Sequence, residues 1–263
     1  MSLFLFVAAF VGGALNSVAG GGSFIGLPAL IFAGVPAVSA NATNTLALWP
    51  ASLSSAWAYR REVAATRARI VTLAGVSLAG GLIGGLLLVR TSDDAFLRLL
   101  PWLLLAAAVT FSCGGMLQRV LARQHPTGEA AKHPTALAPE HPTALDAKHL
   151  TVLFVQFLIS VYGGYFGGGM GIMTLAALTI AGMTDIHQMN AVKSVLAVAI
   201  NGVALAEFVA LGAIAWAPGL IMVAGGIAGG YVGAATARRV DQRYVRSLVM
   251  VSAWGLTVYF FLR

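Results

Sequence analysis

Apolar residues fill long stretches of this chain in which charged residues are almost absent. These stretches cover 40–59, 70–89, 99–118, 194–211, 212–237 and 247–262. A helix needs about 20 apolar residues to cross the core of a bilayer, whereas a helix of a soluble protein keeps a polar face. The pattern predicts an all-α polytopic membrane protein in a lipid bilayer.

Two further apolar segments, 2–35 and 151–183, are interrupted by clusters of glycine. As a straight helix, each would extend roughly 50 Å at 1.5 Å per residue, which exceeds a bilayer core of about 30 Å. Each segment is therefore either one crossing followed by a loop or a hairpin of two short helices. The first residues lack basic side chains, so we interpret them as the first apolar element and not as a cleaved signal.

The two halves of the chain share an ordered set of glycine, asparagine and hydroxyl positions. Residues 20–22 match 167–169, Gly34 matches Gly182, Asn41 matches Asn190, Thr45 matches Ser194, and 80–85 match 225–230. An ordered set of this kind predicts an internal duplication. We divide the chain into a first transmembrane repeat (1–118), a polar linker (119–149) and a second transmembrane repeat (150–263).

The linker contains histidines at a regular spacing of eight residues: His125, His133, His141 and His149. Histidine tracts can bind metal ions. Proline follows most of these histidines and disfavours a helix, and the spacing fixes no coordination geometry. We therefore predict a flexible, partly disordered linker and no metal site.

The basic residues distinguish two topologies. If each glycine-broken segment crosses once, the halves are parallel, and nine basic residues lie on one side against six on the other. If each is a hairpin, the halves are inverted, and twelve basic residues lie with the linker, leaving only Arg90, Arg98 and Arg263 opposite. Cytoplasmic loops are enriched in Lys and Arg. We therefore predict two inverted repeats, each a glycine-broken helical hairpin followed by three transmembrane helices.

This topology places the linker in the cytoplasm and both termini on the other side of the cell (inner) membrane. The net charge of +7 does not indicate nucleic-acid binding, because the basic residues lie between apolar runs. A single cysteine, Cys113, excludes an internal disulfide. No signature of a hydrolase, metalloprotease or nucleotide-binding loop occurs, so we expect neither an enzyme nor a cofactor. The sequence is compatible with a homo-oligomer.

Inverted repeats that begin with broken helices are a transporter plan in which the binding site lies near the middle of the membrane. A helix that starts near Ser23 would direct free N–H groups and a positive dipole end at such a site, as a small anion requires. The alternative is close helix packing through small residues. Candidate substrate-binding residues from the two glycine clusters are Asn16, Gly21, Gly22, Ser23, Gly168, Gly169 and Gly171.

A second set of candidates lies where each half continues after its glycine-broken segment: Asn41, Asn44 and Thr45 in the first half, and Asn190, Lys193 and Ser194 in the second. Residues four apart share a helix face, so their amides and hydroxyls can act together on an anion. Lys193 lies in an apolar context, where a charge is costly and marks a functional site. Alternatively, Lys193 reaches water or pairs with Asp185.

Glu207 is the one acidic residue deep inside an apolar run. A buried carboxylate can carry a coupling proton. The alternative is that Glu207 lies near the outer end of its helix and is hydrated.

The glycine motifs resemble those of the sulfite exporter TauE/SafE family of membrane permeases. The resemblance rests on GGGSFIGLPAL at 20–30, Gly34, NATNT at 41–45, GGYFGGGMGIM at 163–173 and NAVKS at 190–194. It implies export or uptake of small anionic sulfur or organic compounds, such as sulfite or sulfonates, without ATP hydrolysis. The first cluster departs from the second, since Asn16 to Ala19 stand where the second half has Gly163 to Phe166.

We therefore expect a secondary transporter that moves a small anion by alternating access, most simply coupled to the proton gradient. Two other functions remain open at this point. A passive anion channel would use the same glycine-lined route without a gating cycle. An intramembrane enzyme would need an acid–base pair or a metal cluster in the cavity.

Overall fold

The computed structural model describes residues 1–18, 21–124, 147–236 and 242–262, and these residues are almost entirely helical. The described part contains no strand. This confirms the all-α prediction. The helices are α1 (Ser2–Val18), α2 (Ser23–Phe32), α3 (Ala37–Ala58), α4 (Arg60–Ala65), α5 (Arg67–Arg90), α6 (Asp93–Gln124), α7 (Ala147–Tyr165), α8 (Met170–Ile180), α9 (Ile186–Ala210), α10 (Trp216–Thr236) and α11 (Gln242–Leu262).

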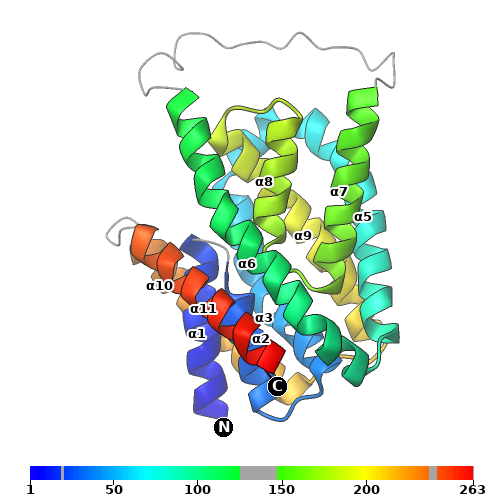
Figure 1. Cartoon of the computed structure of the whole chain (residues 1–263), viewed down its shortest axis with the longest axis vertical. Coiled ribbons are helices and arrows are strands. Elements are labelled where there is room, and N and C mark those ends of the chain that lie inside the picture. The colour runs from blue at the N-terminus through cyan, green and yellow to red at the C-terminus, as the bar shows by residue number, and fades with distance from the viewer. Residues whose placement is uncertain (19–20, 125–146, 237–241, 263) are drawn as a thin grey trace.

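Each glycine-broken segment is a hairpin of two helices. In Figure 1 the chain runs upward through α1 and returns through α2, whereas α7 runs downward and α8 returns upward. Between α7 and α8, Gly167 and Gly169 have φ angles of 81° and 79°. This left-handed backbone favours glycine over residues with a Cβ atom, so the glycines make the reversal possible.

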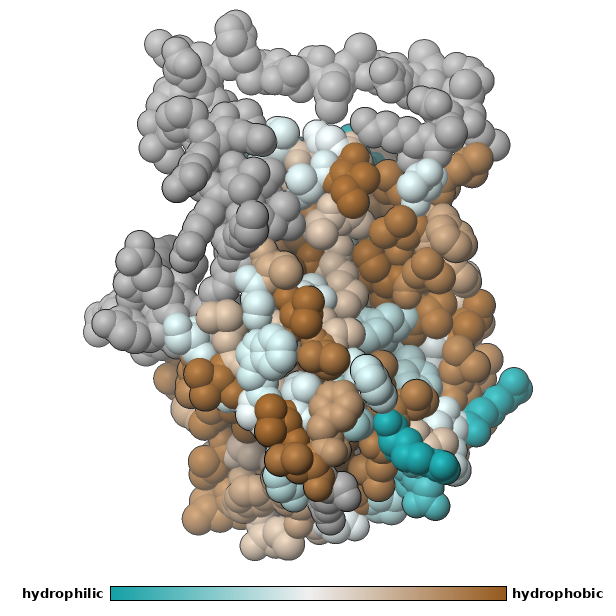
Figure 2. All heavy atoms as spheres, in the orientation of Figure 1, coloured by the Kyte–Doolittle hydropathy of each residue, from teal (hydrophilic) through white to brown (hydrophobic). Residues whose placement is uncertain are grey.

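Four helical segments in the described part are long and apolar enough to cross a membrane: Arg67–Arg90, Asp93–Gly114, Ile186–Ala210 and Trp216–Gly233. Shorter apolar helices accompany them, among them Ser247–Leu262. Apolar side chains cover much of the face in Figure 2, as expected for contact with lipid. The predicted crossing at 40–59 coincides with α3, which is not among these four because it also carries the polar Asn41, Asn44 and Thr45.

Each half packs its first helix against a helix of the other half, and the two contacts involve equivalent helices. Helix α1 lies along α10, and α5 lies along α7; α3 also contacts α10, as α9 contacts α5. A Cβ atom on Gly13 would overlap the backbone of Gly226, and one on Gly164 would overlap the backbone of Gly81. The alternative of close packing is therefore correct for these glycines. The contacts fit a duplicated architecture, while the inverted relation of the repeats stays a prediction.

The chain termini and the linker lie at opposite ends of the molecule. The start of α1 and the end of α11 lie at one end, and the end of α6 and the start of α7 lie at the other (Figure 1). Helix α6 continues to Gln124 and α7 begins at Ala147, both within the range of the predicted linker. The predictions for His125, His133 and His141, for the rest of the linker between these helices, and for Arg263 fall outside the described residues.

Candidate functional site

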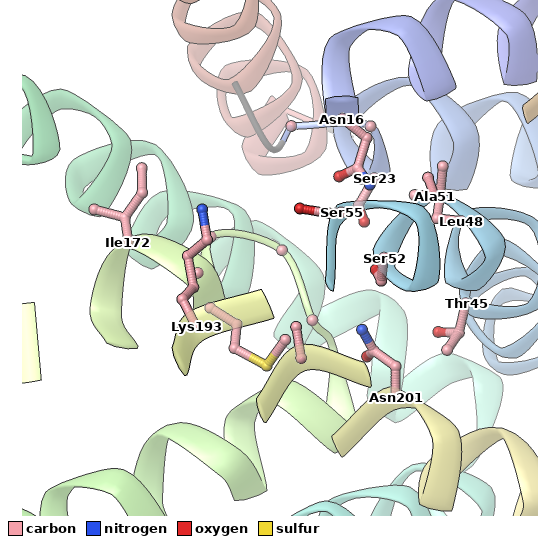
Figure 3. A pocket seen from close by; sticks show the side chains of 18 of the residues that line it. Asn16, Ser23, Thr45, Leu48, Ala51, Ser52, Ser55, Ile172, Lys193 and Asn201 are labelled. Atoms are coloured by element: carbon pink, nitrogen blue, oxygen red, sulfur yellow. The ribbon is translucent and has the colours of Figure 1, made fainter. Parts of the chain in front are cut away.

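A cavity of about 140 Å³ lies between the two hairpins and helices α3 and α9 (Figure 3). Both halves of the chain line it. The lining residues are Asn16, Gly21, Gly22, Ser23, Phe24, Thr45, Leu48, Ala51, Ser52, Ser55, Phe166, Gly167, Gly168, Gly169, Met170, Gly171, Ile172, Lys193, Ser194, Ala197 and Asn201.

Most residues predicted as substrate-binding lie on this cavity. They are Asn16, Gly21, Gly22, Ser23, Thr45, Gly168, Gly169, Gly171, Lys193 and Ser194. These residues come from five helices (α1, α2, α3, α8 and α9) and from the turns of the two hairpins, and their role in substrate binding stays a prediction.

The three predicted asparagines after the hairpins do not line the cavity. The Nδ2 atom of Asn41 donates to the carbonyl of Tyr165 at 2.8 Å, which ties α3 to the end of α7. Asn44 is 2% exposed and packs against Gly26 of the first hairpin. Asn190 accepts a hydrogen bond from Lys193, with an Oδ1–Nζ distance of 2.9 Å. Asn190 therefore holds a lining residue, whereas Asn41 and Asn44 join α3 to α7 and α2 outside the cavity lining.

Three polar lining residues were missed in the sequence: Ser52, Ser55 and Asn201. Ser52 follows Thr45, and Asn201 follows Ser194, by the same seven residues, about two helical turns, so each pair shares the helix face that lines the cavity. That periodicity, applied to the matched motifs, is the signal that could have found Ser52 and Asn201. Ser55 is identified by its contact, since its hydroxyl lies 3.0 Å from that of Ser194 and joins α3 to α9.

The turn before α8 presents backbone N–H groups without partners. No acceptor in the described part of the chain bonds the N–H groups of Gly168, Gly169 or Gly171. The carbonyl of Gly168 is held by the hydroxyl of Tyr162, which donates to it at 2.7 Å. Unpaired N–H groups in a left-handed turn at a helix N-terminus form a concave site suited to an anion.

Lys193 is the only charged side chain among the residues that line the cavity. Its aliphatic carbons lie against Gly171, where an added Cβ atom would be 3.3 Å from the lysine Cδ. The predicted alternative pairing with Asp185 is not observed. That carboxylate instead caps α9 and accepts from the N–H groups of His187 and Gln188. The lysine thus brings one positive charge to the side of the cavity that also holds the α8 turn.

Glu207 lies on α9 but does not line the cavity. Both of its carboxylate oxygens are buried, and neither has a hydrogen-bond partner in the described part of the chain. One oxygen faces α5 at Gly85, where a Cβ atom would overlap it. The carboxylate oxygens are therefore enclosed between α5 and α9, and Glu207 lies in the last turn of α9, near the helix end considered from the sequence.

Residues 5–260 match the sequence profile of the family described as Sulfite exporter TauE/SafE. The chain belongs to this family. Among similar proteins, a probable membrane transporter protein (ORF9) of Sinorhizobium sp is 30% identical, with 97% of this chain and 90% of the relative covered. A probable membrane transporter protein of Haemophilus influenzae is 28% identical, covering 96% and 91%. The probable membrane transporter protein YfcA of Escherichia coli K12 is 25% identical, covering 94% and 84%.

No solved structure matches this chain. The family and the names of the relatives confirm the resemblance seen in the glycine motifs and indicate a membrane transporter.

Proposed function

We propose that this TauE/SafE-family protein is a secondary transporter that binds a small anion in the cavity between its two hairpins. The observation that supports this most is the composition of the cavity wall. Lys193, which forms no ion pair with a carboxylate in the described part of the chain, lies beside the unpartnered N–H groups of the α8 turn. Hydroxyls and amides from both halves complete the lining. The ammonium and the backbone N–H groups favour negative charge, and the hydroxyls and amides can donate hydrogen bonds to it.

The size of the cavity limits the substrate. Cavities of about 150 Å³ accept a ligand as large as benzene, and this cavity measures about 140 Å³. Sulfite, which the family name mentions, and a sulfonate or carboxylate with a short tail are of that size. Phe24, Leu48 and Phe166 supply an apolar portion of the wall against which a short tail can pack.

Alternating access is supported by the way in which the first helix of each half packs against the other half. The pairs α1–α10 and α5–α7 are equivalent contacts on either side of the cavity, and the hairpins α1–α2 and α7–α8 run in opposite directions (Figure 1). In an inverted-repeat transporter, two such arrangements take turns in closing the route to each side. The linker end would face the cytoplasm, because Arg60, Arg61, Arg67 and Arg69 lie at that end.

Accumulation in proteoliposomes tests transport directly. The purified protein is reconstituted with sulfite outside and an imposed pH gradient, and internal sulfite is measured over time. We expect sulfite to exceed its external concentration while the gradient lasts. Simple equilibration to equal concentrations would identify the passive channel and contradict a transporter.

We further propose that the coupling ion is a proton carried by Glu207. An ionised carboxylate without a partner is expensive in a low-dielectric interior, whereas a neutral carboxyl group is much less so. The enclosed position of both oxygens supports this role. In Glu207→Gln protein we expect sulfite to equilibrate but not to accumulate in response to a pH gradient. Accumulation equal to that of the unmodified protein would contradict the proton role while leaving anion transport intact.

A further inference from the structure

Four arginines are concentrated at the junction of α4 and α5. Arg60 and Arg61 begin α4, and Arg67 and Arg69 begin α5, with Glu62 as the only acidic residue among them. Arg60, Arg61 and Arg67 are exposed, and Arg69 is half-buried. None of the four lies within ion-pair distance of a carboxylate in the described part of the chain. We call these four residues the arginine collar.

The collar lies where an apolar helix ends and a polar environment begins. Helix α5 is one of the four segments apolar enough to cross a membrane, and Arg67 and Arg69 stand at its first turn. Helix α4 is held in place by contacts with α9. A bilayer that covers the apolar part of α5 places the collar at the level of the lipid headgroups, where Arg60, Arg61 and Arg67 are exposed.

Trp57 marks the same level independently. Its side chain is 72% exposed, and the guanidinium of Arg60 lies 5.6 Å from the centre of its ring. Exposed tryptophan is typical of the boundary between hydrocarbon and headgroups, where its ring is apolar and its N–H is hydrated. The pair thus places an exposed arginine beside an anchor for the lipid interface.

The opposite end of α5 provides a contrast within the same molecule. Arg90 and Arg98 flank Asp93 and Asp94, so the formal charges of this connection balance. Asp93 also accepts a hydrogen bond from the N–H of Val38 at 2.8 Å. The excess of positive charge at the headgroup level is therefore confined to the collar end of α5.

We infer that the arginine collar binds the headgroups of anionic phospholipids. Arginine forms paired hydrogen bonds with phosphate. Each basic residue near an anionic membrane surface adds to the attraction. Four arginines without carboxylate partners therefore select anionic over zwitterionic lipid. This inference does not depend on the transported substrate.

Lipid retention tests the collar. The full chain is reconstituted in nanodiscs that contain phosphatidylcholine and phosphatidylglycerol, and the lipids that stay bound after transfer to detergent are counted by native mass spectrometry. We expect the unmodified protein to retain phosphatidylglycerol preferentially. In the variant with Arg60, Arg61, Arg67 and Arg69 all changed to Gln, we expect that preference to fall roughly tenfold or more.

The matched control is Arg90→Gln with Arg98→Gln, which removes arginines from the balanced end and should leave the preference unchanged. If the fourfold variant does not fold, Arg60→Gln with Arg61→Gln is measured and should give a smaller loss. An undiminished preference in the collar variants would overturn the inference, as would an equal loss in the control. Competition by inorganic phosphate that removes the bound lipid would instead indicate a site for soluble anions and would also overturn it.

Discussion

At the scale of single residues, two kinds of group form the cavity: those that would contact an anion, and those that hold the first kind in position. Tyr162 belongs to the second kind. Its hydroxyl donates to the carbonyl of Gly168 at 2.7 Å and lies 3.3 Å from the carbonyl of Leu103. By fixing one carbonyl of the turn, Tyr162 keeps the neighbouring N–H groups unpaired beside the cavity. No motif in the sequence indicates this, because the bond joins a helix side chain to a backbone atom six residues later.

Tyr162→Phe should therefore weaken anion binding without removing any group that contacts the anion. A net hydrogen bond is worth about 1 kcal/mol, so we expect the KM for sulfite uptake to rise roughly fivefold, with a smaller change in kcat. Tyr165→Phe is the control, since its hydroxyl bonds Thr91, which does not line the cavity. Equal effects of the two variants on KM would show that the turn is not held by Tyr162.

At the scale of helices, glycine decides how closely the two halves approach. Gly80, Gly84 and Gly164 lie where α5 and α7 touch. Each is positioned so that a Cβ atom would overlap main-chain atoms of the opposing helix. Close approach through small residues is a principal means of helix association in membranes, where apolar burial gives little driving force.

Gly164→Ala should lower the apparent stability of the detergent-solubilised protein. Its Cβ would overlap the backbone of Gly81, and overpacking of this kind costs about 1–3 kcal/mol. Gly75→Ala is the matched control on α5, because nothing lies within 4 Å of the added carbon. Thermal unfolding measures both. A midpoint for Gly164→Ala as high as that of Gly75→Ala would contradict the packing described for α5 and α7.

The sequence predicted helices and glycine breaks better than it predicted side-chain directions. Apolar run lengths predicted the all-α fold, because a bilayer constrains the length and composition of a crossing strongly. The distribution of basic residues then favoured hairpins over single crossings for the two glycine-broken segments. The matched motifs contain Lys193 and Ser194, which line the cavity. They did not show that Asn41 turns toward Tyr165 or that Asn190 bonds Lys193. Those choices depend on contacts between helices far apart in the sequence.

At the scale of the whole molecule, the relation between the halves determines the transport mechanism. Inverted repeats place equivalent residues on opposite sides of the membrane, whereas parallel repeats place them on the same side. Ala33 and Ala181 are a suitable pair, since each caps the second helix of its hairpin and precedes a matched glycine. In Figure 1 the ends of α2 and α8 lie at opposite ends of the molecule.

Labelling with a membrane-impermeant maleimide distinguishes these topologies in intact cells. In a Cys113→Ser background we expect Ala33→Cys to react from outside and Ala181→Cys to react only after permeabilisation. Ser92→Cys, in the α5–α6 connection, should behave like Ala33→Cys, and Ala65→Cys, at the end of α4, like Ala181→Cys. Reaction of Ala33→Cys and Ala181→Cys from the same side would require parallel repeats.

The central claim is that a small anion binds beside Lys193 and the α8 turn, and ligand-dependent thermal unfolding of the purified protein measures this most directly. A ligand at 100 times its Kd stabilises the folded state by about 2.7 kcal/mol. We predict that sulfite raises the unfolding midpoint of the unmodified protein above that in sodium chloride of equal ionic strength. The same rise should be largely lost in Lys193→Gln and kept in Ser54→Ala, an exposed α3 position outside the cavity. A sulfite-dependent rise of equal size in Lys193→Gln would contradict the account.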